Sequence, residues 1–131
     1  MIIIDTTVWI DYFRGAHSPH ADWLEANLVS ERLGLTDLIL CEVLQGITVP
    51  AEFDAVLMEL SRFMVFATGG IEVAVAAARN YRQLRTEGRT VRGTIDLLIA
   101  TFCLLEGHAL LHNDRNYDSF ETLLGLKVVH P

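Results

Sequence analysis

The sequence predicts an α/β fold, a doubly wound α/β/α sandwich with a mainly parallel central sheet. Short runs of branched apolar residues alternate with longer segments of helical periodicity, and the first run, residues 2–4, is apolar at every position. Runs of this kind are typical of strands that helices cover on both faces. Strands separated by helices favour parallel pairing, because a parallel neighbour is reached only through a crossover connection.

The expected elements follow one another without repeats, low-complexity tracts or a linker. Thr36 or Asp37 is placed to cap one helix, Pro50 suits the first position of the next, and Gly15 and Gly46 suit helix ends. We expect strands at residues 2–5, 32–36, 63–67, 108–112 and 126–130. We expect helices at residues 7–13, 19–29, 37–45, 50–61, 71–87 and 94–106.

Length and composition indicate a single domain spanning residues 1–131. A chain of 131 residues with 51% hydrophobic and 21% charged residues has room for one globular core. No apolar run reaches the roughly 18 residues of a membrane span, and the first residues do not have the basic flank of a signal peptide. We therefore expect a cytoplasmic protein with no membrane partner.

Neither cysteines nor histidines show the spacing of a metal site. Cys41 and Cys103 lie in apolar helix-like segments without a CxxC pattern, so we expect two buried, reduced thiols. The five histidines lack HxH or HxxxH spacing, and we expect them in loops or at the surface. They are His17, His20, His108, His112 and His130.

The net charge of −7 argues against a nucleic-acid partner, but the charge is unevenly distributed. Five of the ten basic residues fall between Arg79 and Arg92, and Glu87 is the only acid in residues 73–95. On a continuous helix, four of these arginines would span an arc of about 120°. They are Arg79, Arg82, Arg85 and Arg89. Two interpretations stay open, a stripe that binds RNA phosphates and an ordinary solvated helix face.

Four acids lie in or beside sequence that should be buried. They are Asp5, Glu42, Asp96 and Asp114. Each has a structural explanation by itself, since an acid can cap a helix, favour a helix N-terminus, open a turn or reach solvent. Together they indicate a site, because buried acids need partners and few basic residues are near them in the sequence. Parallel strands place ligands above their carboxyl ends, and an all-oxygen cluster there suits Mg²⁺ or Mn²⁺.

The stretches around these acids resemble the PIN-domain family, specifically the VapC-type toxins of bacterial toxin–antitoxin pairs. The stretches are IIIDTTVWIDYF, LILCEVLQG, TIDLLIATFCLLEG and HNDRNYD, and the resemblance spans nearly the whole chain. It implies a metal-dependent endoribonuclease that a cognate antitoxin holds inactive, with the four acids as its site. Thr6 matches a small hydroxyl residue that supports the site, and Asn113 matches a frequent polar position. Asn116 departs from the family, where a second acid is common, and this leaves the role of Asp118 open.

The resemblance also sets expectations for individual roles. Hydrolysis of an RNA phosphodiester needs an activated water and neutralisation of phosphate charge, which a divalent cation can supply. We expect Asp5 and Asp96 to be the principal Mg²⁺ or Mn²⁺ ligands, Asp114 to bind the cation directly or through water, and Glu42 to act as ligand or base.

Partners and an alternative function complete the expectations. Apolar and aromatic residues at 7–13 and 50–60 lead us to expect a homodimer and an antitoxin peptide across these helices. The alternative function is a non-catalytic PIN-like module that binds RNA or protein. The presence of all four acids argues against that alternative.

Overall fold

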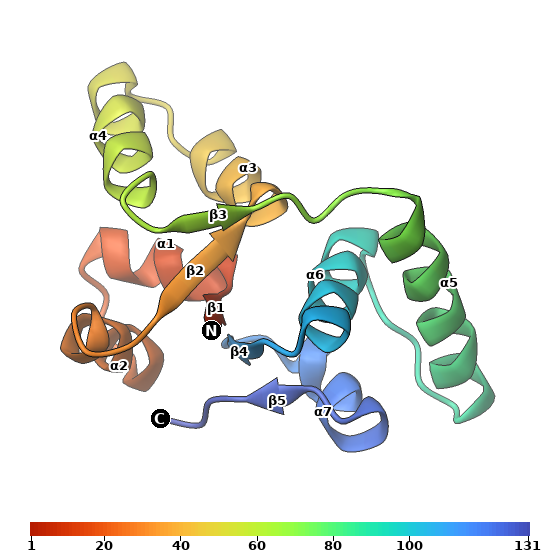
Figure 1. Ribbon diagram of the computed structural model, residues 1–131. Coiled ribbons are helices and arrows are strands. Elements are labelled where there is room, and N and C mark those ends of the chain that lie inside the picture. The colour runs from red at the N-terminus through yellow and green to blue at the C-terminus, as the bar shows by residue number, and fades with distance from the viewer.

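The computed structural model describes residues 1–131 and contains five parallel strands in the order β3-β2-β1-β4-β5, flanked by helices (Figure 1). The predicted α/β fold with a parallel sheet is confirmed. The strands are β1 (Ile2–Ile4), β2 (Leu33–Thr36), β3 (Met64–Phe66), β4 (Ala109–Leu111) and β5 (Lys127–Val128). The helices are α1 (Thr6–Arg14), α2 (Pro19–Asn27), α3 (Asp37–Gln45), α4 (Pro50–Leu60), α5 (Ile71–Thr86), α6 (Thr94–Glu106), the 3₁₀ turn η1 (Arg115–Tyr117) and α7 (Asp118–Leu124).

Local capping explains why several helices begin where the sequence predicts. The Thr36 hydroxyl accepts a hydrogen bond from the Ile39 amide at 3.2 Å, so Thr36 rather than Asp37 caps α3. Pro50 occupies the first turn of α4, where its missing N–H costs nothing. Two elements, η1 and α7, were not predicted, because the polar stretch around residues 113–119 carries no helical apolar periodicity.

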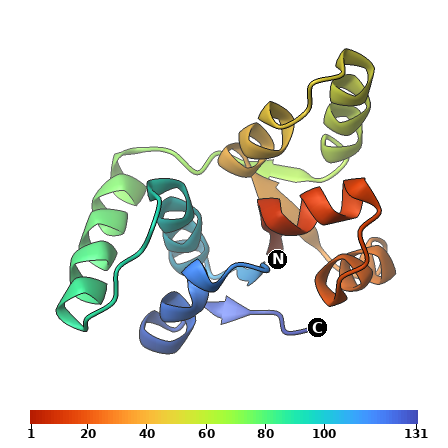
Figure 2. The ribbon, with the colours of Figure 1, turned by 180° about the vertical axis from the view of Figure 1, so that it is seen from behind.

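The connections divide the helices into two groups. From β1 the chain moves outward through α1 to α4 to reach β3, and it then returns past β1 through α5 and α6 to reach β4. Helix α1 packs on α2 and α3, and α5 packs on α6 (Figure 2). Since the winding direction changes between β1 and β4, the carboxyl ends of these two strands border the crevice where open α/β sheets bind ligands.

One continuous core of 24 buried residues holds the sheet and helices together. Its largest fully buried side chains are Trp9, Tyr117 and Phe120. The Trp9 ring lies 5.2 Å from the Phe63 ring, which joins α1 to the segment before β3. No helix has the length and apolarity to cross a membrane.

One expectation about the burial of side chains is wrong. Cys41 is exposed on α3 rather than buried, whereas Cys103 is buried and its burial raises the thiol pKa to about 12. Phe53 on α4 is 36% exposed, because that helix contacts the body mainly through α3. His112 lies in the loop directly after β4, and its side chain is buried there, being only 8% exposed.

A single carboxylate fixes the long segment that leads from β3 to α5. Oδ1 of Asp37 accepts a hydrogen bond from the Thr68 amide at 2.9 Å and another from the Thr68 hydroxyl. Thr68 is fully buried, so water cannot replace Asp37 as the acceptor of its hydrogen bonds. Burial raises the Asp37 pKa, but the hydrogen bonds from Thr68 outweigh it and leave the pKa below its usual value.

We expect Asp37→Ala to destabilise the fold by about 1–3 kcal/mol, because the buried Thr68 donors lose their acceptor. Urea unfolding at neutral pH measures this loss. Asp54→Ala, which removes an exposed acid on α4, is the matched control and should change stability by less than about 0.5 kcal/mol. Equal stabilities of the two variants would contradict the role of Asp37.

Candidate active site

Asp5 lies at the crevice between β1 and β4. Its backbone amide donates to the Leu111 carbonyl oxygen at 2.9 Å, directly after the last paired residues of the two strands. Oδ2 of Asp5 accepts hydrogen bonds from the Thr7 hydroxyl at 2.7 Å and the Thr7 amide at 3.3 Å. Asp5 therefore ends a buried strand and also caps α1, and its side chain is only 2% exposed.

The Tyr117 hydroxyl connects the first acid to the third. Its oxygen lies 2.8 Å from Oδ1 of Asp5 and 3.2 Å from Oδ1 of Asp96. A phenol has one hydrogen to donate, so it can serve only one of the two carboxylates at a time. The Oδ1 atoms of the two acids therefore share a single donor hydrogen.

Asn116 holds Asp96 from the other side. Its Nδ2 donates to Oδ2 of Asp96 at 2.8 Å and also to the Arg92 carbonyl oxygen. Its Oδ1 accepts from the Arg92 amide at 3.0 Å. Both hydrogens of the amide and its oxygen are thus engaged, and they join the loop before α6 to the first turn of that helix.

Asp114 and Asp96 line the same hollow, which has a volume of about 440 Å³ and an entirely polar lining. Oδ1 of Asp114 accepts from the Asn116 amide at 2.9 Å, so Asp114 also caps η1. The hollow is lined by Thr90, Arg92, Asp96, Asp114, Arg115 and Asn116. Asp114 therefore caps the turn η1 and also lines the hollow of the candidate site.

Glu42 reaches the site through Thr6. The Thr6 hydroxyl donates to Oε1 of Glu42 at 2.7 Å, which ties α3 to the first residue of α1 beside Asp5. Asn113, the other expected supporting residue, is exposed, and its backbone amide rather than its side chain joins the network by donating to the Thr7 hydroxyl at 3.2 Å. Asp118 is exposed and lies on a second hollow with Asp114, apart from Asp96.

None of the four acids forms an ion pair. The ion pairs of the chain are His17–Asp22, Arg62–Glu59 and His130–Glu121, all outside the site. Burial raises the Asp5 pKa to about 6, the negative charge of Asp96 adds to this, and the hydrogen bonds from Thr7 and Tyr117 oppose it. The site therefore concentrates negative charge that no ion pair to a lysine or arginine neutralises.

The donor set suits a hard divalent cation. As the side chains stand, no three His, Cys, Asp or Glu residues are close enough to share one metal ion. Mg²⁺ is usually held by one or two carboxylates while it keeps several waters, so the pair Asp5 and Asp96 meets its requirement without a closed protein cage. Both carboxylates already share one oxygen neighbour in Tyr117.

Sequence reasoning missed Tyr117 and His112 as parts of the site. Nδ1 of His112 accepts from the Asp114 amide at 3.2 Å, and its ring lies 4.7 Å from that of Tyr117. Burial lowers the His112 pKa, so the neutral ring supports the turn. The one usable signal was chemical: a buried tyrosine hydroxyl usually needs a hydrogen-bond partner, and acids were the partners nearby.

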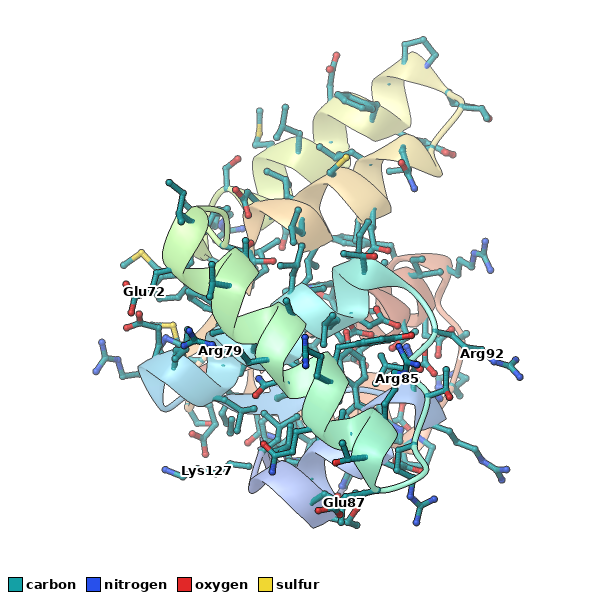
Figure 3. All side chains as sticks on the ribbon, turned by 90° about the vertical axis from the view of Figure 1, so that its right-hand side faces the viewer. Glu72, Arg79, Arg85, Glu87, Arg92 and Lys127 are labelled. Carbon is teal, nitrogen blue, oxygen red and sulfur yellow. The ribbon has the colours of Figure 1, made fainter.

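The arginine stripe forms only in part. Arg79, Arg82 and Arg85 are exposed on α5, and Arg79 and Arg85 extend toward opposite edges of the helix in Figure 3. Arg89 lies beyond the end of α5 at Thr86, so the expectation that it belongs to the helical stripe is wrong. Gly88, with φ of +76°, follows the helix end and redirects the chain before Arg89.

Comparisons with known proteins agree on one family. A sequence model of the PIN domain matches residues 2–123. VapC ribonuclease Mb1587 from Mycobacterium bovis is 32% identical over a 133-residue alignment that covers 97% of this chain and 96% of the relative.

Solved structures with less than 25% identity support the fold. The structure of VapBC2 from Rickettsia felis bound to a promoter DNA fragment contains a chain that matches with a TM-score of 0.77 and 18% identity, covering 98% of both chains. A toxin–antitoxin complex from Klebsiella pneumoniae matches with a TM-score of 0.73 and 21% identity, covering 100% of this chain and 98% of the other.

The raised pKa of Asp5 predicts a specific pH dependence of stability. Below its ordinary pKa of 3.8 the carboxyl is protonated in both the folded and the unfolded chain. As pH rises from 3.8 to about 6, the Asp5 carboxyl ionises in the unfolded chain but stays largely protonated in the folded one. The metal-free fold therefore loses stability over this range. Above about 6 the carboxyl is ionised in both states and the loss is constant.

We therefore expect Asp5→Asn to gain stability relative to the unaltered protein as pH rises from about 4 to about 6, by up to about 3 kcal/mol, and to gain no more above that. Urea unfolding in EDTA at a series of pH values measures the difference. Asp54→Asn serves as the exposed control. A difference for Asp5→Asn that is constant with pH would contradict the raised pKa.

Proposed function

Because the chain belongs to the PIN-domain family and has VapC ribonucleases among its full-length relatives, we propose that it is a metal-dependent endoribonuclease toxin whose activity a cognate antitoxin blocks. Residues 1–131 would act as a single PIN domain. The observation that carries the proposal is the approach of Asp5 and Asp96 to one tyrosine hydroxyl, at the crevice of the sheet and without a cationic partner.

Asp5 and Asp96 would hold Mg²⁺ or Mn²⁺, with Asp114 as a direct or water-mediated ligand across the polar hollow. A bound divalent cation would supply charge neutralisation at the phosphate and an acidified water. Glu42 is suited to receive a proton from that water. Its Oε1 accepts from Thr6, which fixes the side chain and leaves Oε2 without a hydrogen-bond donor in the chain.

Thr6 and Tyr117 would keep the acids in place while they act. The Thr6 hydroxyl restrains Glu42, and the Tyr117 hydroxyl restrains the first and third acids from the opposite side. Both residues are buried, so their hydroxyls are held in fixed positions. Asn113 contributes through its backbone.

We assign an RNA-binding role to Arg79, Arg82 and Arg85 on α5, and to Arg89 in the following loop, as a broader contact surface for the RNA backbone.

An antitoxin segment fits the groove between α1, α2 and α4. Tyr12, Phe13 and Val56 give this groove an apolar floor, and three acids border it. The acids are Asp22, Glu25 and Glu59. We propose that the antitoxin places apolar side chains on the floor and basic side chains against the acids.

A homodimer is also proposed, since several large apolar side chains remain exposed on α5 and α6.

We expect Asp5→Asn and Asp96→Asn each to lower RNA cleavage at least about a hundredfold, since even residues behind metal ligands commonly contribute ten- to a hundredfold. EDTA should stop cleavage by the unaltered protein, and Mn²⁺ or Mg²⁺ should restore it. Asp54→Asn is the control. RNA cleavage is measured in nuclease-free preparations, with circular dichroism as the test of folding.

Undiminished cleavage by a folded Asp5→Asn or Asp96→Asn variant would remove that acid from the mechanism, and cleavage in excess chelator would remove the metal. No cleavage by the unaltered protein, together with RNA or protein binding, would favour the non-catalytic module instead.

The groove makes a second prediction, about the antitoxin. Reversing two groove charges, as Glu25→Lys with Glu59→Lys, should prevent co-purification with the antitoxin encoded by the neighbouring reading frame and should leave RNA cleavage intact. The matched control is Glu31→Lys with Glu87→Lys, two exposed acids outside the groove. Co-purification of the antitoxin with the groove variant at the level of the control would contradict the proposed interface.

A further inference from the structure

Two arginines at the polar hollow have no structural role that accounts for them. Arg92 and Arg115 line the hollow together with Asp96 and Asp114, and both are exposed. Neither arginine forms an ion pair with these or any other acids of the chain. Two arginines and two carboxylates thus border one hollow, and the guanidinium groups of both arginines remain available to a ligand.

The backbone that carries Arg92 is fixed, although it belongs to a loop. The side-chain amide of Asn116 accepts a hydrogen bond from the Arg92 backbone N–H and donates one to the Arg92 carbonyl oxygen. The same side chain also donates to Asp96. An aspartate at position 116 would offer no donor to the Arg92 carbonyl or to Asp96. The asparagine therefore holds the Arg92 backbone at a set position relative to the third acid.

Arg115 is fixed from the other direction. It is the first residue of η1, between Asp114, whose side chain caps this turn, and Asn116, which binds Asp96. The positions of both arginine backbones are thus set by the same short turn that positions the acids. In Figure 3, Arg92 lies on the same side of α5 as Arg85.

We propose that Arg92 and Arg115 form a phosphate-binding subsite for the RNA backbone beside the acids. This inference rests on the proposed function. A chain of net charge −7 with a concentrated acidic site repels RNA, so a substrate phosphate needs local positive charge to approach. Guanidinium groups bind phosphate oxygens in a bidentate manner and stay charged at all relevant pH values. The hollow of about 440 Å³ is in the size range of small-molecule sites.

The subsite differs from the arginines on α5. Arg82 and Arg85 line a separate hollow with Thr86, and no acid lies among its lining residues. Contacts there would add general affinity for RNA. Contacts at Arg92 and Arg115 would set the position of the backbone relative to Asp96 and Asp114, which line the same hollow.

The test compares Arg92→Gln with Arg115→Gln, as a double variant, against Arg32→Gln with Arg62→Gln. The control removes the same charge from exposed residues outside the hollow. Binding of a fluorescein-labelled, single-stranded RNA of random sequence is measured in EDTA, where the proposed cleavage does not occur, at several KCl concentrations. Loss of two phosphate contacts should reduce the slope of log affinity against log salt by about 1.4, at roughly 0.7 for each contact.

Kinetics in Mn²⁺ provide the second readout. We expect the double variant to raise KM at least about tenfold with a smaller change in kcat, while the control changes neither beyond twofold. A salt slope and KM equal to those of the control would overturn the subsite. Failure of the unaltered protein to cleave RNA, with the arginine-dependent salt slope intact, would overturn the proposed function and leave the phosphate-binding subsite standing.

Asn116→Ala tests the positioning separately. The substitution keeps both arginines but releases the Arg92 backbone, so we expect faster hydrogen exchange at the Arg92 amide and a smaller salt slope than in the unaltered protein. An unchanged exchange rate, or an unchanged slope despite faster exchange, would overturn the role assigned to Asn116.

Discussion

The contact on which the site depends is the shared hydroxyl between Asp5 and Asp96. Tyr117 brings an acid at the end of β1 and an acid on α6 to one oxygen atom, although it has only one hydrogen to give. Burial of Asp5 raises its pKa to about 6, although the hydrogen bonds from Thr7 and Tyr117 lower it, and no cation forms an ion pair with this acid. Such a group lowers the stability of the metal-free fold, which is understandable when the same carboxylates serve a function.

The rest of the site is organised by the short turn η1. Asp114 begins it, Asn116 binds Asp96 and the Arg92 backbone, and Tyr117 ends it against Asp5. One 3₁₀ turn thus links the ends of β1 and β4, the start of α6 and the loop after α5. Displacement of this turn would move the acids and the arginines together. We therefore expect substitutions in η1 to affect RNA cleavage even where the substituted residue does not contact an acid.

Much of this architecture could be predicted from the sequence, and the reasons for the gaps are physical. Apolar runs and helix caps identified every strand and six helices, because burial on both faces and capping are local properties. The four acids were selected as candidates because charges in apolar segments are costly. Tyr117 and Asn116 were not assigned roles, because their hydrogen bonds to acids 112 and 20 positions away, respectively, leave no local pattern. Arg89 was misplaced because Gly88 ends the helix earlier than the charge spacing indicated.

The central claim is that Asp5 and the acids near it bind a divalent cation, and thermal melting with Mn²⁺ tests it most directly. We expect Mn²⁺ to raise the Tm of the unaltered protein increasingly with concentration, since ligand binding stabilises the folded state by an amount that grows with concentration over Kd. The shift should persist in Asp54→Asn and shrink strongly in Asp5→Asn, although asparagine caps α1 about as well as aspartate does. An Mn²⁺ shift of the same size in Asp5→Asn and Asp54→Asn would contradict the account.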